Sequence, residues 1–255
     1  MNEFFCTIFV PILTGILLFM IPGRIRIVKE FISLLAVVAA LYYSIVLYGQ
    51  GDRIIDLANT FNVSLSVSDI AFLTDTGNIH LHVDSLSRLI VLFIGISGFL
   101  ILVYSVFYNK DKIRGFYSYY LITLGASFGA ALSDNFILFI IFWGMLGITL
   151  YKLIPGVDEA SSASAKKALI IIGASDGIMI LGIAILWKIT GTLSMAEIKL
   201  PTQGALYIFT FLTLITGSFT KAGAFPFHSW VPDYTQCSPA SVSAFAVRIT
   251  GVWSS

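Results

Sequence analysis

Seven long apolar runs dominate this sequence of 255 residues and constrain its fold more than any other feature. A helix needs about 20 mostly apolar residues to cross the roughly 30 Å hydrocarbon core of a bilayer. The runs lack the two-residue alternation of membrane strands, which argues against a β-barrel. Only 11% of the residues are charged, whereas a soluble domain carries about 25%. The sequence therefore predicts an all-α polytopic membrane protein.

We expect seven transmembrane helices and a candidate eighth. The first run carries Glu3 as its only charge, so we expect it to be retained as a span rather than cleaved as a signal peptide. The runs cover residues 4–21, 31–48, 86–108, 117–132, 136–154, 168–189 and 205–219, and the candidate eighth begins at residue 239.

Loop charges predict the orientation of these spans. Basic residues gather in alternate loops, at positions 24–29, 110–114 and 152–167, whereas the loops between them are mainly acidic. The positive-inside rule then places the basic loops in the cytoplasm and the N-terminus outside.

The stretch of residues 51–83 is the one long polar segment. Residues 61–67 (FNVSLSV) and 78–83 (NIHLHV) alternate apolar and polar side chains around a TDTGN turn, which predicts a small β-hairpin before the third helix. His80 and His82 share one face of its second strand. They could bind a metal, but no third ligand is evident, and we favour a solvated strand face.

Composition excludes several functions. The net charge is +1 without a basic run, which argues against nucleic-acid binding. Cys6 and Cys237 are far apart and suggest neither a disulfide framework nor a zinc site. There is no haem-ligand pair, cysteine cluster or glycine-rich nucleotide loop, so we expect no cofactor and no metal.

Charged side chains at the centre of a membrane span cost about 2.5–3.5 kcal/mol each and need a reason. Asp176 lies near the middle of the sixth run, among the small residues Gly173, Ala174, Ser175 and Gly177, which would let another helix approach closely. It is either a functional acid or a structural one bonded to a neighbouring backbone.

Lys221 precedes a predicted break in the seventh helix. Pro226 lacks an N–H and clashes with the carbonyl of Ala222, Gly223 loosens the same turn, and Pro232 limits continuation. We expect the helix to break just after Lys221 and to leave unpaired carbonyls, which membranes tolerate where they are buried in protein or line a wet cavity. A Lys there can carry protons, or it snorkels to the headgroups.

His228 lies past this break. Histidine titrates near neutral pH and suits a proton relay. The alternative is an interfacial histidine beside Trp230.

These residues stand in a pattern that resembles the antiporter-like subunits of respiratory complex I, membrane-bound hydrogenases and multisubunit sodium/proton antiporters. The resemblance covers about residues 81–252. The matching strings, in order, are VDSLSRL, YSVFY, LSDNFILFIIFWG, SDGIMILGIAI, TGTLSMAEI, KAGAFPFHSWVPD and SPASVSAF. Each string alone is weak, whereas their order and spacing together are specific.

The resemblance implies two inverted repeats of five helices, each with a broken helix, and buried charged residues that carry protons near the midplane. By position, Lys221 matches the Lys of the first broken helix. Asp176 matches the Asp of the sixth helix, and His228 matches the His after the broken-helix Pro.

Two departures from the family pattern concern the relay. The family usually has Trp–Glu in the fifth helix, and that Glu pairs with the broken-helix Lys, but here Trp143 is followed by Gly144. The eighth helix usually carries a His where Val247 stands. Asp176 is then the candidate partner of Lys221.

The resemblance also suggests how the chain is divided. Residues 1–50 hold two transmembrane helices, 51–83 an external loop, 84–115 the third helix and a basic loop, and 116–255 the first repeat, with the second repeat absent.

We therefore expect a proton-translocating subunit of a complex I-type NADH:quinone oxidoreductase, a related hydrogenase or a cation/proton antiporter complex, without a redox centre of its own. Lys221, Asp176 and His228 would form the relay, and Gly223, Pro226 and Pro232 the broken helix. Its partners would be other membrane subunits and the lipid bilayer of a prokaryotic inner membrane, and it would move protons or sodium. The rivals are a fragment of a longer subunit, and a non-pumping scaffold subunit.

Overall fold

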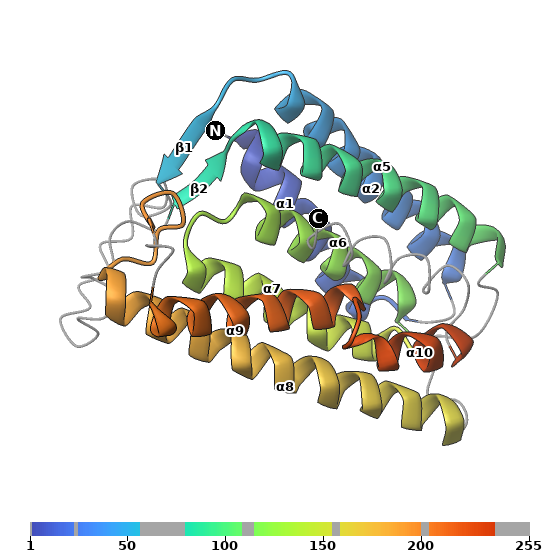
Figure 1. Cartoon of the computed structure of the whole chain (residues 1–255). Coiled ribbons are helices and arrows are strands. Elements are labelled where there is room, and N and C mark those ends of the chain that lie inside the picture. The colour runs from blue at the N-terminus through green and yellow to red at the C-terminus, as the bar shows by residue number, and fades with distance from the viewer. Residues whose placement is uncertain are drawn as a thin grey trace.

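The computed structural model describes residues 2–22, 25–56, 80–108, 115–154, 159–199 and 204–237. Figure 1 shows long helices running alongside one another, with two short strands at one end of the bundle. The long helices are α1 (Asn2–Met20), α2 (Arg26–Tyr48), α5 (Ser85–Tyr108), α6 (Phe116–Leu132), α7 (Phe136–Lys152), α8 (Glu159–Thr190) and α9 (Ala205–Ala222). All seven predicted spans are therefore confirmed as helices, and the candidate eighth lies outside the described residues.

Five of these helices, α1, α2, α5, α8 and α9, are long and apolar enough to cross a membrane, while α6 and α7 have 17 residues each. α8 begins at Glu159 rather than at residue 168, because its alanine-rich start favours a helix and buries Ser161 and Ala165 on the packed face. Its 32 residues span roughly 48 Å at 1.5 Å per residue, which exceeds the hydrocarbon core.

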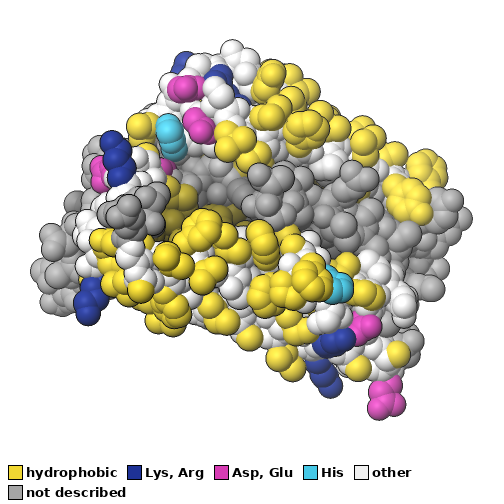
Figure 2. Space-filling model, viewed as in Figure 1, with side chains coloured by type: hydrophobic (Ala, Val, Ile, Leu, Met, Phe, Trp, Pro, Cys, Tyr) yellow, Lys and Arg dark blue, Asp and Glu magenta, His cyan; other side chains and the backbone are white. Residues whose placement is uncertain are grey.

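Large apolar side chains cover the outside of the bundle. On the face in Figure 2, hydrophobic side chains occupy the middle, and the charged side chains gather towards the two ends. Leu17, Phe107 and Ile170 are more than half exposed, at 60%, 69% and 68%. A soluble protein would bury such residues, whereas lipid solvates them. The chain is an all-α integral membrane protein.

α6 lies at the centre of the bundle and packs against α1, α2, α5 and α7. Nearly every residue of this helix is buried, as expected for a helix that is apolar on all sides. α1 approaches it at two glycines. A Cβ on Gly125 would lie 2.7 Å from the Ile8 carbonyl oxygen, and one on Gly15 would lie 2.8 Å from that of Ser118. The two backbones are therefore nearly in contact.

The predicted hairpin is partly corrected. β2 (His80–Val83) forms, but it pairs antiparallel with β1 (Arg53–Asp56), which directly follows α2. Residues 61–67 lie outside the described residues. His80 and His82 are half-buried rather than solvated, because β2 also bridges to Ser133 before α7.

Candidate functional site

The buried face of α9 is made of small and polar residues. It consists of Thr210, Thr213, Gly217, Thr220 and Lys221. These positions recur at intervals of three and four, so they lie along one side of the helix. Lys221 is thereby carried into the protein on the α9 face that packs against α8.

Two glycines bring α8 and α9 close together. A Cβ on Gly217 would lie 2.6 Å from the Cβ of Met179, and a Cβ on Gly182 would collide with Thr213. The two helices run antiparallel, so residue numbers decrease along α8 as they increase along α9. One further turn along each helix brings Lys221 beside Asp176.

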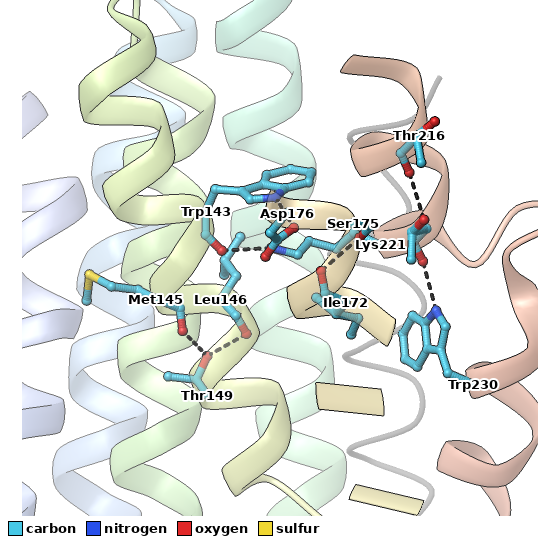
Figure 3. A network of polar contacts seen from close by, with 11 residues as sticks. Trp143, Met145, Leu146, Thr149, Ile172, Ser175, Asp176, Thr216, Lys221 and Trp230 are labelled. Carbon is cyan, nitrogen blue, oxygen red and sulfur yellow. Dashed lines mark hydrogen bonds and ion pairs between the residues drawn. The ribbon is translucent and has the colours of Figure 1, made fainter. Parts of the chain in front are cut away.

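Lys221, Asp176 and Trp143 form one closed polar cluster (Figure 3). The Lys221 Nζ donates to the backbone carbonyl of Trp143 at 2.7 Å and to Asp176 Oδ2 at 3.4 Å. The Trp143 indole Nε1 donates to Asp176 Oδ1 at 2.8 Å. The Lys221 side chain is 0% exposed and that of Asp176 is 17% exposed. The structure therefore places Asp176 where the sequence predicted a partner for Lys221.

Sequence reasoning missed the part that Trp143 takes in this cluster. It named Trp143 only as the neighbour of the position where the family has Glu. The signal was present, because an indole N–H in the middle of an apolar span needs an acceptor. Asp176 is that acceptor.

Two glycines of α7 border the cluster. A Cβ on Gly147 would lie 3.6 Å from Asp176 Oδ2, so this glycine leaves room for the carboxylate. A Cβ on Gly144 would meet no described atom within 4 Å. The position of the missing family Glu therefore borders open space in the described part of the chain.

In the described part of the chain, the small residues around Asp176 do not all pack against another helix. Gly173, Ala174 and Gly177 are exposed on α8, and Ser175 is buried. Among the described residues no helix approaches at these three exposed positions, and the expectation that they admit another helix stays a prediction. α9 instead approaches at Gly182.

α9 ends at Ala222, as predicted, but the helix is ended by Gly223 rather than by Pro226. Gly223 adopts a left-handed conformation, with φ of 67°. Its N–H donates to the carbonyl of Thr220, and the Ala224 N–H donates to that of Phe219. This is the Schellman arrangement, which satisfies the last carbonyls of a helix. The helix ends at glycine before Pro226 is reached.

The segment after the break continues past the end of α9 and packs against α8 (Figure 1). η1 (His228–Trp230) leads into α10 (Val231–Cys237). The Trp230 indole donates to the Thr220 carbonyl at 2.8 Å. The prediction of unpaired carbonyls at the break is thus wrong for Phe219 and Thr220.

Pro232 does not stop a helix, contrary to expectation. It lies in the first turn of α10, where a missing N–H costs nothing and the fixed φ of proline suits the helix. α10 is held to α8 by an exposed ion pair, in which the Lys167 Nζ lies 2.6 Å from Asp233 Oδ2.

His228 is exposed and stands apart from the cluster. Its ring lies against that of Phe225, with 5.8 Å between centroids. In the described part of the chain, the hydrogen bonds of Lys221 and Asp176 go to each other and to Trp143, and none reaches His228. The structure joins two of the three predicted relay residues directly.

Two of the matching sequence strings have a structural role at the opposite end of the bundle. Asp134, in LSDN, accepts from the Ser194 hydroxyl at 2.9 Å and from the Ala196 N–H at 3.0 Å, both in TLSMAEI. Its own N–H donates to the His80 carbonyl at 3.2 Å. We call this set of contacts the Asp134 clamp. It ties together the β2, α6–α7 and post-α8 segments, three loops that the charge pattern places on one side.

Within the VDSLSRL string, Asp84 caps the N-terminus of α5. The Ser87 N–H donates to Asp84 Oδ1 at 2.7 Å, and the Ser87 hydroxyl donates to the same oxygen. Burial opposes ionisation of Asp84, but the two bonds from Ser87, together with nearby His82 and a bond from the Asp84 backbone, lower the pKa of this carboxyl below its usual value. Asp84 thus satisfies the start of α5.

Comparison with known proteins gives a consistent family. Residues 133–252 match the family described as NADH:quinone oxidoreductase/Mrp antiporter, TM. An Na(+)/H(+) antiporter subunit of Alkalihalophilus pseudofirmus is 34% identical over 184 residues, and one of Staphylococcus haemolyticus is 35% identical over 184 residues. Each match covers 69% of this chain and 23% of the relative, so the chain spans about a quarter of their length.

Solved structures share the fold. A chain of the Mrp complex from Dietzia sp. superposes with a TM-score of 0.77 at 17% identity, covering 98% of this chain and 47% of that one. A chain of respiratory complex I from Thermus thermophilus with bound NADH gives a TM-score of 0.77 at 17% identity, covering 98% and 50%. These structures share the fold, and the sequence matches show that the chain belongs to the antiporter-like membrane subunit family.

Proposed function

We propose that this chain is a proton-translocating membrane subunit in which Lys221 and Asp176 exchange the proton. The observation that carries the proposal is a lysine that is 0% exposed inside a membrane bundle, 3.4 Å from a carboxylate of a second helix. Buried charges in membranes are costly and are typical of proton and ion pathways. This pair stands in for the Lys–Glu pair of the family.

The cluster supports a simple transfer. When Lys221 gives its proton to Asp176, an N–H bond breaks, an O–H bond forms on Oδ2, and both groups become neutral. The reverse step restores the ion pair. The end of α9 lies one residue beyond Lys221, at Ala222, and the exposed His228 follows it. On this proposal, protons reach or leave Lys221 past that end.

The main experiment replaces Lys221. We expect Lys221→Ala to abolish proton movement in membrane vesicles that contain the assembled complex, measured with a pH-sensitive dye. Lys188→Ala is a matched control, because Lys188 is exposed near the end of α8. Wild-type proton movement in assembled Lys221→Ala would refute the proposal.

A non-pumping scaffold is the second candidate, and Gly144 favours it because the family Glu is missing. Gly144→Glu separates the two functions. The space at position 144 admits a side chain, so the variant adds a second carboxylate next to the cluster. A relay should show an altered rate of proton movement, whereas a scaffold should change only in stability.

We propose that the chain works beside other membrane subunits of an NADH:quinone oxidoreductase, hydrogenase or cation/proton antiporter complex in a bacterial inner membrane. The supporting observation is that the relatives are named as antiporter subunits and the structural neighbours are complexes. Mass measurement of the native complex tests this, and a chain isolated without partners would contradict it. Sodium-dependent proton movement in the same vesicles distinguishes an antiporter.

The basic loops face the cytoplasm on this proposal. A cysteine introduced at Lys166, in a variant without Cys6 and Cys237, should react with a membrane-impermeant thiol reagent only from the cytoplasmic side. Reaction from the outside would reverse the orientation.

A further inference from the structure

We infer that Trp143 is the positioning residue of this cluster, because this one residue holds both charged partners through three separate contacts. The inference rests on the proposed function, in which Lys221 and Asp176 exchange the proton. It adds a residue that is neither donor nor acceptor of that proton.

The first contact selects one carboxylate oxygen. The Trp143 Nε1 donates to Asp176 Oδ1 at 2.8 Å. An indole nitrogen is only a donor, so this contact is always made in the same direction. Oδ1 is thereby occupied, and Oδ2 is left as the oxygen that faces Lys221 (Figure 3). Trp143 thus determines which oxygen takes the proton.

The other two contacts hold the ammonium group. The Lys221 Nζ donates to the Trp143 carbonyl at 2.7 Å and lies 4.0 Å from the centroid of the Trp143 ring. A cation within about 6 Å of an indole face is attracted to it. Lys221 is therefore bound to the backbone and to the ring of the same residue.

Together these contacts keep the ion pair apart. A bond between an ammonium and a carboxylate is usually about 2.7–2.9 Å long, but Lys221 Nζ and Asp176 Oδ2 are 3.4 Å apart. Trp143 holds the carboxylate from one side and the ammonium from another. A looser pair is easier to separate, which is what a relay that must release its proton requires.

Trp143 is itself held rigidly. It is 2% exposed and forms a cluster with Met179, Ile183 and Leu193. Its ring also lies against that of Phe139, with 5.0 Å between centroids. A side chain packed on several sides keeps one rotamer, so its N–H stays directed at Asp176.

Trp143→Phe tests the inference, because it keeps the carbonyl and a ring face but removes the N–H. We expect proton movement by the assembled complex to fall about tenfold, the effect of losing one hydrogen bond to a charged group. Trp187→Phe is the matched control, since Trp187 packs against the same apolar cluster, and it should keep the wild-type rate. Trp143→Phe moving protons as fast as Trp187→Phe would overturn the inference.

The outcomes separate the two proposals. If Lys221→Ala stops proton movement and Trp143→Phe does not slow it, the proposed function stands and the positioning role falls. If Lys221→Ala has no effect on proton movement, the proposed function is refuted, and the inference about Trp143 that rests on it is refuted as well.

Should Trp143→Phe fail to assemble, ultraviolet Raman spectra of the wild type and of Asp176→Ala decide instead. One indole N–H hydrogen-bond signal should be lost in Asp176→Ala. Unchanged indole signals would overturn the inference.

Discussion

Two helix pairs in this bundle are brought together by glycine, but against different neighbours. In the α1–α6 pair, Gly125 and Gly15 face backbone oxygens of the other helix. In the α8–α9 pair, Gly182 and Gly217 face the side chains of Thr213 and Met179. Backbone cannot move aside without moving the helix, whereas the Thr213 hydroxyl beside Gly182 can rotate. At Gly182 the pair that carries the buried charges is therefore more adjustable than the α1–α6 pair, while at Gly217 the Cβ of Met179 is fixed by the α8 backbone.

The largest expected effect comes from the α8–α9 pair. Asp176→Ala leaves the Lys221 ammonium buried without its carboxylate, which should lower the free energy of unfolding by about 3 kcal/mol. Adding Lys221→Met should recover most of this loss, because no charge then remains unpaired. SDS-induced unfolding in micelles measures both. Equal stability of the single and double variants would show that the pair is not coupled.

Gly125→Ala should cost about 1–3 kcal/mol of unfolding free energy by overpacking the α1–α6 pair. The new Cβ would lie 2.7 Å from the Ile8 carbonyl oxygen, which can yield only if α1 moves. Gly177→Ala is the control, since its Cβ would meet no described atom within 4 Å. Thermal unfolding of both should separate them, and similar melting temperatures would weaken the comparison.

Gly182→Ala should have a smaller effect than Gly125→Ala. The new methyl meets the Thr213 hydroxyl, which can rotate away, and alanine favours a helix over glycine by about 1 kcal/mol. We expect a net change within about 1 kcal/mol. A loss as large as that of Gly125→Ala would mean that the α8–α9 pair is equally rigid.

The smallest expected effect concerns the exposed link from α10 to the α8–α9 pair. The side chains of Lys167 and Asp233 are 44% and 42% exposed, and such ion pairs contribute about 0–1 kcal/mol. Lys167→Gln should therefore lower the unfolding free energy by a few tenths of a kcal/mol. High salt should remove this difference from the wild type, and a salt-independent loss would contradict the assignment.

The sequence was sufficient to predict those elements that hydrophobicity alone determines. Runs of apolar residues predicted all seven helices. The family resemblance, with its fifth-helix Glu missing here, left Asp176 as the predicted partner of Lys221. Sequence reasoning failed for features that depend on which residues are neighbours in three dimensions. Strand partners are set by the path of the chain, so β1 was missed.

Local rules also competed with one another. Pro226 and Gly223 both predict a break, and only the structure shows that the left-handed Gly223 acts first. Pro232 reads as a breaker in sequence, yet it suits the first turn of α10. Trp143 was missed because a tryptophan in a span is ordinary until the acceptor of its N–H is known.

The Asp134 clamp has a mechanical consequence for α8. It fastens the segment just after this helix to the α6–α7 loop and to β2 through backbone and carboxylate bonds. Near the other end, the contact to α10 includes the exposed ion pair of Lys167 and Asp233. A tilt of α8 about this clamp would have to carry α9 with it, because the two helices pack closely against each other. Such a tilt would move the Glu159 end of α8 the most and its clamped end the least, and Asp176 would shift by an intermediate amount set by its distance from the clamp.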